Sequence, residues 1–134
     1  MILEIPYGRE EKQEVDIPDR NLAGVIYPNE VESGETMREI RRGIEEPIDS
    51  PSLEEFLKCQ GSLVFIINDG TRPTPTAKVL EALSTMMNLS FPRYLVATGA
   101  HREPTEEEYQ FVLGGLREQL RPRVHPHDCR KDRM

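Results

Sequence analysis

Apolar and polar residues recur along the chain with two different periods, which mark out its strands and helices. The second half holds apolar, β-rich runs at 62–67 and 93–97, and a shorter run at 123–125. Between them, apolar residues recur at helical spacing over 75–88 and again after Thr105. Strands alternating with helices in this order predict a parallel sheet with right-handed crossovers. We therefore expect an α/β, Rossmann-like, three-layer fold.

The first half is predicted to add a small β-hairpin and a helix. Residues 2–6 and 13–17 alternate between apolar and polar positions on either side of a turn at Gly8, a pattern typical of antiparallel strands. The run at 22–27 predicts a further short strand. Ile and Met side chains at helical spacing predict a helix over 36–48.

Capping residues indicate where the helices begin. The expected first or capping residues are, in chain order, Ser33 or Gly34, Ser52, Thr74 and Thr105. Glu55 and Glu108 each follow a capping hydroxyl by three residues, which is the capping-box pattern. Pro75 suits the first position of a helix because it has no N–H to leave unpaired.

Length and composition favour one globular domain of 134 residues. A net charge of -7 argues against a general nucleic-acid binder, which needs clustered cations. No apolar run has membrane-spanning length, and residues 1–6 are too short and acidic for a signal sequence. With Cys59 and Cys129 as its two cysteines, the chain is expected to be a cytoplasmic protein with reduced thiols.

Two polar turns follow the strands at 62–67 and 93–97. Parallel strands end at the same edge of a sheet, where α/β proteins bind ligands, so Asp69, Arg72 and His101 are expected to converge there. Arg72 is suited to clamp a carboxylate or phosphate, and His101 to carry a proton near neutral pH. The simpler alternative is that Asp69 and Arg72 only stabilise their own turn while His101 is solvated.

His125, His127 and Cys129 occupy alternate positions, which would place them on one face of an extended segment. Their spacing is not that of a zinc ribbon, and Cys59 is the only further Cys that could join them. We assign no metal site to this cluster.

The two polar turns stand within longer motifs. Residues 69–75 read Asp-Gly-Thr-Arg-Pro-Thr-Pro, and residues 97–108 read Ala-Thr-Gly-Ala-His-Arg-Glu-Pro-Thr-Glu-Glu-Glu. His-Asp-Cys follows at 127–129, and the segments 5–8 and 28–31 add to the pattern. Together these motifs resemble the N-terminal domain of the nickel-pincer-dependent lactate racemase family, over essentially the whole chain.

The resemblance implies a 2-hydroxyacid racemase or epimerase whose cofactor is a nickel-pincer nucleotide, nickel pyridinium-3,5-bisthiocarboxylate mononucleotide. In that family the α-hydrogen leaves as hydride onto the cofactor while a His takes the hydroxyl proton, and return of the hydride to the other face inverts the centre. Here His101 resembles one of two acid–base histidines. Asp69, Gly70, Thr71 and Arg72 resemble the segment that meets cofactor and substrate, with Arg72 as the anion clamp.

The resemblance is incomplete. The family's cofactor-holding lysine, nickel-ligating His and second acid–base His lie in a later portion, and Lys78 and Lys131 stand in no matching motif. Residues 1–134 are therefore expected to be the N-terminal domain without the family's C-terminal domain. The chain would be an excised domain, a truncated homologue or one subunit of a split enzyme, and inactive alone.

Two other functions stay open on the residues alone. A non-catalytic small-molecule or nucleotide-binding module would keep the cleft without the chemistry. A plain interaction domain would need neither Arg72 nor His101 for ligand binding. A further segment or partner with a Lys and His constellation would favour the enzyme.

Overall fold

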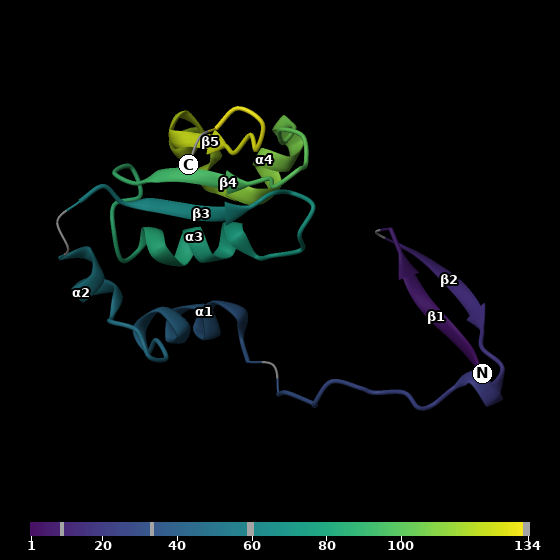
Figure 1. The fold of residues 1–134 in the computed structure, drawn as a ribbon. Coiled ribbons are helices and arrows are strands. Elements are labelled where there is room, and N and C mark those ends of the chain that lie inside the picture. Colours follow the sequence, from purple (N-terminus) through teal and green to yellow (C-terminus); the bar gives the residue numbers. More distant parts are fainter. Residues whose placement is uncertain (9, 33, 59–60, 133–134) are drawn as a thin grey trace. The chain divides into compact units, whose positions relative to one another are not determined.

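The computed structural model describes residues 1–8, 10–32, 34–58 and 61–132, and it divides into two compact units, Met1–Glu32 and Ser33–Met134 (Figure 1). The first unit contains the antiparallel strands β1 (Ile2–Tyr7) and β2 (Glu11–Asp16), which confirms the predicted hairpin. A 3-10 turn, η1 (Asp19–Asn21), follows.

The predicted strand at 22–27 is wrong, because residues 22–32 form no regular structure. Pro18 and Pro28 lie on either side of residues 22–27, and Gly24 lies within them. No strand among the described residues pairs with it, and an extended segment without a partner leaves its N–H and C=O groups to water. Apolar, β-branched composition alone did not make a strand here.

The second unit holds the α/β part of the chain. Its elements are α1 (Thr36–Glu45), α2 (Leu53–Leu57), β3 (Val64–Asn68), α3 (Thr76–Ser84), β4 (Arg93–Ala97), α4 (Glu106–Leu113), η2 (Gly114–Leu116), α5 (Arg117–Leu120), η3 (Arg121–Arg123) and β5 (Val124–Pro126). The strands form a parallel sheet in the order β3-β4-β5 (Figure 1). The α/β class with a parallel sheet is therefore confirmed.

The core lies between the sheet and its crossover helices. Alternate strand residues, including Ile67, Tyr94 and Val96, are buried together with Leu80 of α3 and Leu113 of α4. The two helices contact each other, as expected when sequential strands are joined by right-handed crossovers that place both helices on one face. None of the described helices has both the length and the apolar character needed to cross a membrane.

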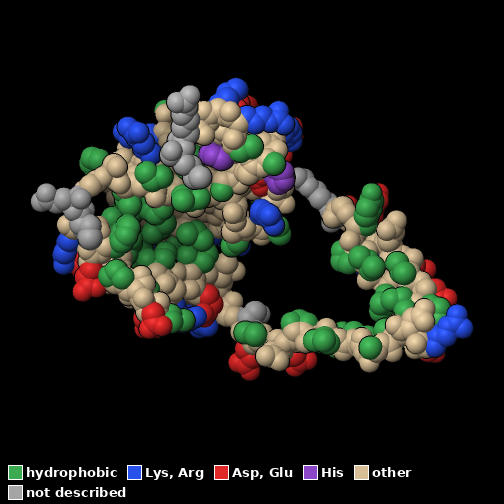
Figure 2. Space-filling view, viewed as in Figure 1, with side chains coloured by type: hydrophobic (Ala, Val, Ile, Leu, Met, Phe, Trp, Pro, Cys, Tyr) green, Lys and Arg blue, Asp and Glu red, His purple; other side chains and the backbone are tan. Residues whose placement is uncertain are grey.

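Alternation along β3 exposes its other side chains. Ile66 is 72% exposed and Val64 is also exposed. The next residue along β3, Ile67, points to the opposite face of the sheet and is buried. Figure 2 shows apolar side chains gathered over β3 and α3 in this view.

Local capping explains where most helices begin. Both predicted capping boxes form, one from Ser52 and Glu55 at α2 and one from Thr105 and Glu108 at α4. The cap of α1 is Glu35, whose carboxylate accepts two backbone N–H bonds, rather than Gly34. The other predicted start, Ser33, lies outside the described residues. The helix ends at Glu45 instead of residue 48 because the residue before Pro47 is disfavoured in helical conformation.

The start of α3 differs from its prediction. Thr74 does not cap the helix, because its Oγ1 accepts a 2.7 Å hydrogen bond from Asn68 Nδ2. Pro75 occupies the capping position and α3 begins at Thr76. The helix also ends earlier than residue 88, at Ser84, where hydroxyls of Ser84 and Thr85 bond to backbone carbonyls one turn back.

The covered face of the sheet yields a stability prediction. Leu113→Ala is expected to lower the free energy of unfolding by about 2–5 kcal/mol, because Leu113 is 0% exposed and its truncation leaves a cavity. Phe111→Ala is the matched control on the same helix; Phe111 is 56% exposed, and its loss is expected to stay within about 0.5 kcal/mol. Urea unfolding followed by circular dichroism measures both. Equal losses in the two variants would contradict this packing.

Candidate functional site

The carboxyl ends of β3 and β4 lie side by side. Asn68 pairs with Ala97 at the ends of the two parallel strands, so the turns that begin at Asp69 and Thr98 emerge at the same edge. Asp69 is buried, with 6% of its surface exposed, and its Oδ2 lies 2.7 Å from Nδ1 of His101. The structure thus brings together two of the side chains that the sequence singled out.

The other oxygen of Asp69 is used within its own turn. Oδ1 accepts hydrogen bonds from the Thr71 amide at 3.1 Å and from the Thr71 hydroxyl at 2.6 Å. Burial raises the pKa of Asp69, but the hydrogen bonds from Thr71 and His101 outweigh it, so the pKa lies below its ordinary value. Asp69 is therefore an anion at neutral pH, and its Oδ2 accepts a hydrogen bond from a ring N–H of His101.

This pairing sets the tautomer of His101. A carboxylate can only accept, so the Nδ1 of a neutral His101 carries the proton and Nε2 keeps a free lone pair. The His101 side chain is 53% exposed, which leaves Nε2 accessible to a ligand. The arrangement suits a group that takes a proton from a ligand, with Asp69 stabilising the resulting imidazolium.

Arg72 faces the same edge without pairing to Asp69. Its backbone N–H donates to the Asp69 carbonyl at 3.4 Å, and its guanidinium makes no ion pair with any described residue. The turn-stabilising ion pair considered from sequence is therefore not formed; Thr71 performs that role instead. Arg72 and His101 both line an open hollow of ≈ 560 Å³, together with Asn68, Thr74 and residues 97–100.

The glycines of the two turns serve different purposes. Gly99 has φ +59, in the left-handed region that side chains with a Cβ rarely adopt. At Gly70, a Cβ would lie 2.7 Å from Cβ and Cγ of Glu108. The close approach at Gly70 is therefore to α4, and Gly70 is needed to let that helix pack against the Asp69 turn.

Glu108 also holds the residue after His101. Arg102 donates two hydrogen bonds to the Glu108 carboxylate, at 2.8 Å and 3.0 Å, in a bidentate pair. The sequence showed Glu108 only as part of a capping box, because the contact to Arg102 depends on how the loop folds back on α4. The helix cap and the His101 loop are thus joined through one carboxylate.

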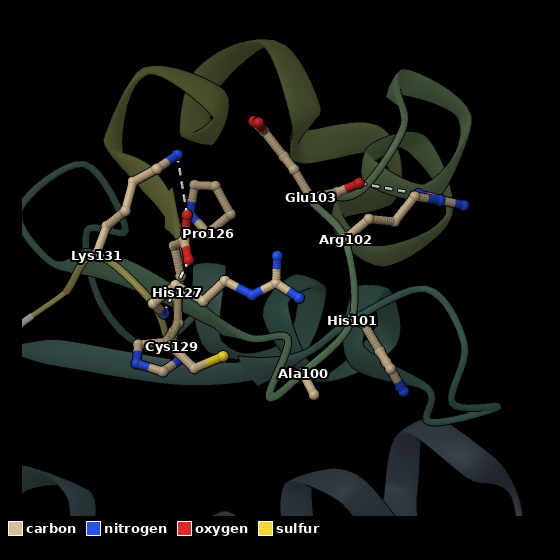
Figure 3. Close-up of a pocket in the computed structure, with 10 residues that line it drawn as sticks. Ala100, His101, Arg102, Glu103, Pro126, His127, Cys129 and Lys131 are labelled. Atoms are coloured by element: carbon tan, nitrogen blue, oxygen red, sulfur yellow. Dashed lines mark hydrogen bonds and ion pairs between the residues drawn. The ribbon is translucent and has the colours of Figure 1, made fainter.

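A third turn reaches the same edge after β5. The His127 amide donates to the Val96 carbonyl at 3.0 Å, and the hydroxyl of Thr98, which is 2% exposed, donates to the His127 carbonyl. Figure 3 shows His127, Cys129 and Lys131 on one side of a hollow and His101 and Arg102 on the other. Thr98 was not singled out from sequence, and its only sequence signal is its place at a strand end.

The side chains of His125, His127 and Cys129, which were considered as metal ligands, do not lie together in the structure. His125 Nε2 lies 3.2 Å from Asp132 Oδ2, and His125 lines neither hollow, whereas His127 and Cys129 line the hollow in Figure 3. Over the described ranges, no three His, Cys, Asp or Glu side chains are placed to hold a metal ion. Cys129 is an exposed free thiol, and Cys59 lies outside the described residues.

The Asp69–His101 contact predicts the tautomer of the imidazole. Wild-type His101 is expected to be protonated at Nδ1 when neutral. In Asp69→Asn, the Thr71 donors hold the amide oxygen, so the NH₂ group faces His101 and favours the tautomer protonated at Nε2. Imidazole ¹⁵N shifts in long-range ¹H–¹⁵N spectra distinguish the two. Thr71→Ser keeps the hydroxyl and should keep the wild-type tautomer; an unchanged tautomer in Asp69→Asn would refute the assignment.

Glu108 predicts an acid-sensitive step in stability. The hydrogen bonds from Arg102, and then the N–H of Thr105, lower the pKa of Glu108 from 4.5 to about 2. A carboxylate with a depressed pKa stabilises the fold above its unfolded pKa, and this contribution is lost as pH falls through the folded pKa. The melting temperature is therefore expected to fall between about pH 4.5 and pH 2.

Glu108→Gln should be less stable at pH 7 and lose part of that pH dependence. The neighbouring Glu107→Gln is the control, since Glu107 is exposed on the same turn. Thermal unfolding at a series of pH values compares them. The pairing is wrong if both variants keep the wild-type pH dependence.

Comparison with known proteins identifies the family of this chain. A family described as "Lactate racemase N-terminal domain" matches residues 7–134. The lactate racemase of Thermoanaerobacterium thermosaccharolyticum is 29% identical over 119 residues, covering 84% of this chain and 28% of the relative. That of Lactiplantibacillus plantarum is 32% identical over 116 residues, covering 79% of this chain and 26% of the relative.

A solved structure shows a likeness to the same family. The lactate racemase apoprotein from Thermoanaerobacterium thermosaccharolyticum matches with a TM-score of 0.69 and 28% identity, over 96% of this chain and 30% of that one. The chain thus spans less than a third of the length of the proteins it matches. The family match covers nearly all of it, and both polar turns lie inside the matched range. The chain belongs to the lactate racemase N-terminal domain family.

Proposed function

We propose that this chain supplies the acid–base His and the anion-binding turn of a lactate-racemase-like 2-hydroxyacid racemase or epimerase. The observation that carries the proposal is the 2.7 Å contact between Asp69 Oδ2 and His101 Nδ1 at the carboxyl edge of the parallel sheet. It orients an imidazole with a free nitrogen toward the hollow that Arg72 also lines.

The chemistry of inversion assigns His101 its role. To racemise a 2-hydroxy acid through a planar keto acid, the hydroxyl must lose its proton as the α-hydrogen departs. His101 Nε2 takes that proton, and the Asp69 carboxylate stabilises the imidazolium. When hydrogen returns to the other face of the carbon, a proton must be given back to the oxygen, and a protonated His101 can donate it.

Arg72 binds the carboxylate of the substrate. Its guanidinium makes no ion pair with a described residue and lines the hollow beside His101. Two parallel N–H bonds to a carboxylate fix both the position and the rotation of a small hydroxy acid. An open hollow of ≈ 560 Å³ does not distinguish lactate from larger 2-hydroxy acids, so the substrate is assigned by class.

The fit of the nickel-pincer nucleotide to this chain is partial. The described residues place no three metal-ligating side chains together, so they do not form a nickel site. The Thr71 amide and hydroxyl are committed to Asp69, which leaves Arg72 as the side chain of 69–72 with free donors. When bound in the complete enzyme, the cofactor would accept the α-hydrogen as hydride; nickel ligation is assigned to the part of the relatives that this chain does not span.

The partner of this chain is then the remaining part of such an enzyme, covalently continuous or separate. The net charge of -7 gives no support to a nucleic-acid partner. We propose a cytoplasmic location, which the exposed free thiol of Cys129 supports because thiols stay reduced in that compartment.

A non-catalytic ligand-binding module is the second candidate. It is supported by the guanidinium of Arg72, which has no ion pair with a described residue and lines the open hollow, a feature that binding alone would require. Such a module would bind hydroxy acids through Arg72 but would not need a proton acceptor. The two functions therefore differ in the effect of removing His101.

Racemisation by the completed enzyme tests the proposal. With the remaining domain of a homologue and the cofactor supplied, His101→Asn is expected to lower kcat by on the order of 10²–10⁴, the usual contribution of general acid–base catalysis. Arg72→Ala should lower kcat/KM by roughly 10–100-fold, because it removes charge-assisted hydrogen bonds to the carboxylate. Interconversion of D- and L-lactate and of a panel of 2-hydroxy acids measures both.

His125→Asn is the matched control, since His125 is exposed, pairs with Asp132 and lines neither hollow. It should keep wild-type rates. Full racemisation by His101→Asn would overturn the acid–base role. Hydroxy-acid binding without racemisation, unchanged by His101→Asn, would establish the binding module instead.

A further inference from the structure

The contact between Asp69 and His101 joins two separate turns, so its length depends on how each turn is held. Asp69 belongs to the turn after β3, and His101 to the loop after β4. The His101 backbone N–H donates to the Thr98 carbonyl at 2.9 Å, which fixes the loop on the side that precedes His101. The His101 side chain is 53% exposed, so packing holds the imidazole only in part. Its position therefore also depends on the residues that follow it in the loop.

Arg102 holds the loop beyond His101. Its Nη1 donates to the Glu103 carbonyl at 2.9 Å and to Glu108 Oε2 at 2.8 Å, and its Nη2 donates to Glu108 Oε1 at 3.0 Å. Figure 3 shows the Arg102 side chain extending away from Cys129. A planar guanidinium that makes two parallel bonds to one carboxylate has a defined orientation. The Arg102 donors are thus used to tie the loop to α4.

Glu108 contacts the Asp69 turn as well, through its carbon atoms. A Cβ at Gly70 would lie 2.7 Å from Cβ and Cγ of Glu108, so α4 lies directly against this turn. The Glu108 carboxylate holds Arg102 and also accepts the Thr105 amide at 2.7 Å, which orients it from the helix. One side chain of α4 therefore touches the turn of Asp69 and holds the loop of His101.

We propose that Arg102 and Glu108 are positioning residues, which keep the His101 imidazole at hydrogen-bonding distance from Asp69. Exposed ion pairs contribute little unless their geometry is bidentate and well fixed, and this pair meets both conditions. The pair would act on the reaction only through His101. The inference rests on the proposed function for its effect on racemisation, whereas its effect on the imidazole does not.

The tautomer of His101 tests the geometry in the chain itself. Glu108→Gln keeps the capping box, because Gln also serves at this position, but it removes the charge-assisted pair with Arg102. The Asp69 contact is expected to lengthen, so the imidazole ¹⁵N shifts should move from the form protonated at Nδ1 toward a mixture of tautomers. Arg102→Gln breaks the same pair without changing the cap and should give the same shift. Long-range ¹H–¹⁵N spectra measure both, at a temperature where circular dichroism shows both variants folded.

Glu106→Gln is the matched control. Glu106 lies in the same first turn of α4 and forms an ion pair with Arg117, which belongs to neither turn of the site. The control loses an ion pair of the helix and should keep the wild-type tautomer. Arg102→Lys keeps the charge without the two parallel bonds and should give an intermediate result. A wild-type tautomer in both Glu108→Gln and Arg102→Gln, or an equal change in the control, overturns the proposal.

Racemisation by the completed enzyme shows whether the pair acts through position. Arg102→Gln is expected to lower kcat by on the order of 10–100-fold and to leave KM near wild type, because a displaced proton acceptor slows the reaction without weakening substrate binding. Combining Arg102→Gln with Glu108→Gln should cost no more than the larger single loss, since both remove one tether. Additive losses, or a raised KM at unchanged kcat, contradict the positioning role.

The two readouts distinguish this inference from the proposed function. If Arg102→Gln and Glu108→Gln change neither the tautomer nor kcat while His101→Asn abolishes racemisation, the positioning role alone is wrong. If both variants change the tautomer and His101→Asn racemises at the wild-type rate, the positioning role stands and the acid–base role fails.

Discussion

The hydrogen bond between Asp69 and His101 is the interaction on which the candidate site depends. It joins the ends of two neighbouring parallel strands, and it places an ionised carboxylate at a position where only 6% of the residue is exposed. A buried carboxylate is tolerable only when its oxygens are hydrogen-bonded, and here Thr71 satisfies one oxygen and His101 the other. The same bond fixes which nitrogen of His101 faces the hollow, so burial, orientation and proton chemistry follow from one contact.

The surrounding residues hold the two turns in place. Gly70 lets α4 approach the Asp69 turn, and Glu108 on that helix clamps Arg102, the residue after His101. Thr98 secures the third turn through the His127 carbonyl. Each loop is therefore tied to a helix or strand of the core, which is how a site on loops keeps its geometry.

The charges at this edge suggest how the work of a complete enzyme would be divided. Arg72 and Arg130 have no ion pairs among the described residues, and they line two different hollows that both include His101. We propose that Arg72 holds a substrate carboxylate, while nickel chemistry is left to the part of the relatives that this chain does not span. A carboxylate fixed by Arg72 would position the hydroxyl of a 2-hydroxy acid beside His101, and such positioning reduces the entropy cost of the proton transfer.

The sequence by itself determined the parallel α/β class, the hairpin, both capping boxes and the meeting of Asp69 with His101. All of these follow from local periodicity, from side chains three residues apart, or from the rule that parallel strands end at one edge. Tertiary structure decided the rest. In the folded chain, Thr74 accepts a hydrogen bond from Asn68 instead of capping α3, and residues 22–27 have no partner strand among the described residues. Arg102 pairs with Glu108, and Arg130 lies at the edge beside His101. These outcomes depend on which groups lie close in space once the loops have folded, and the choice among competing hydrogen-bond partners has no signature in the periodicity of the sequence.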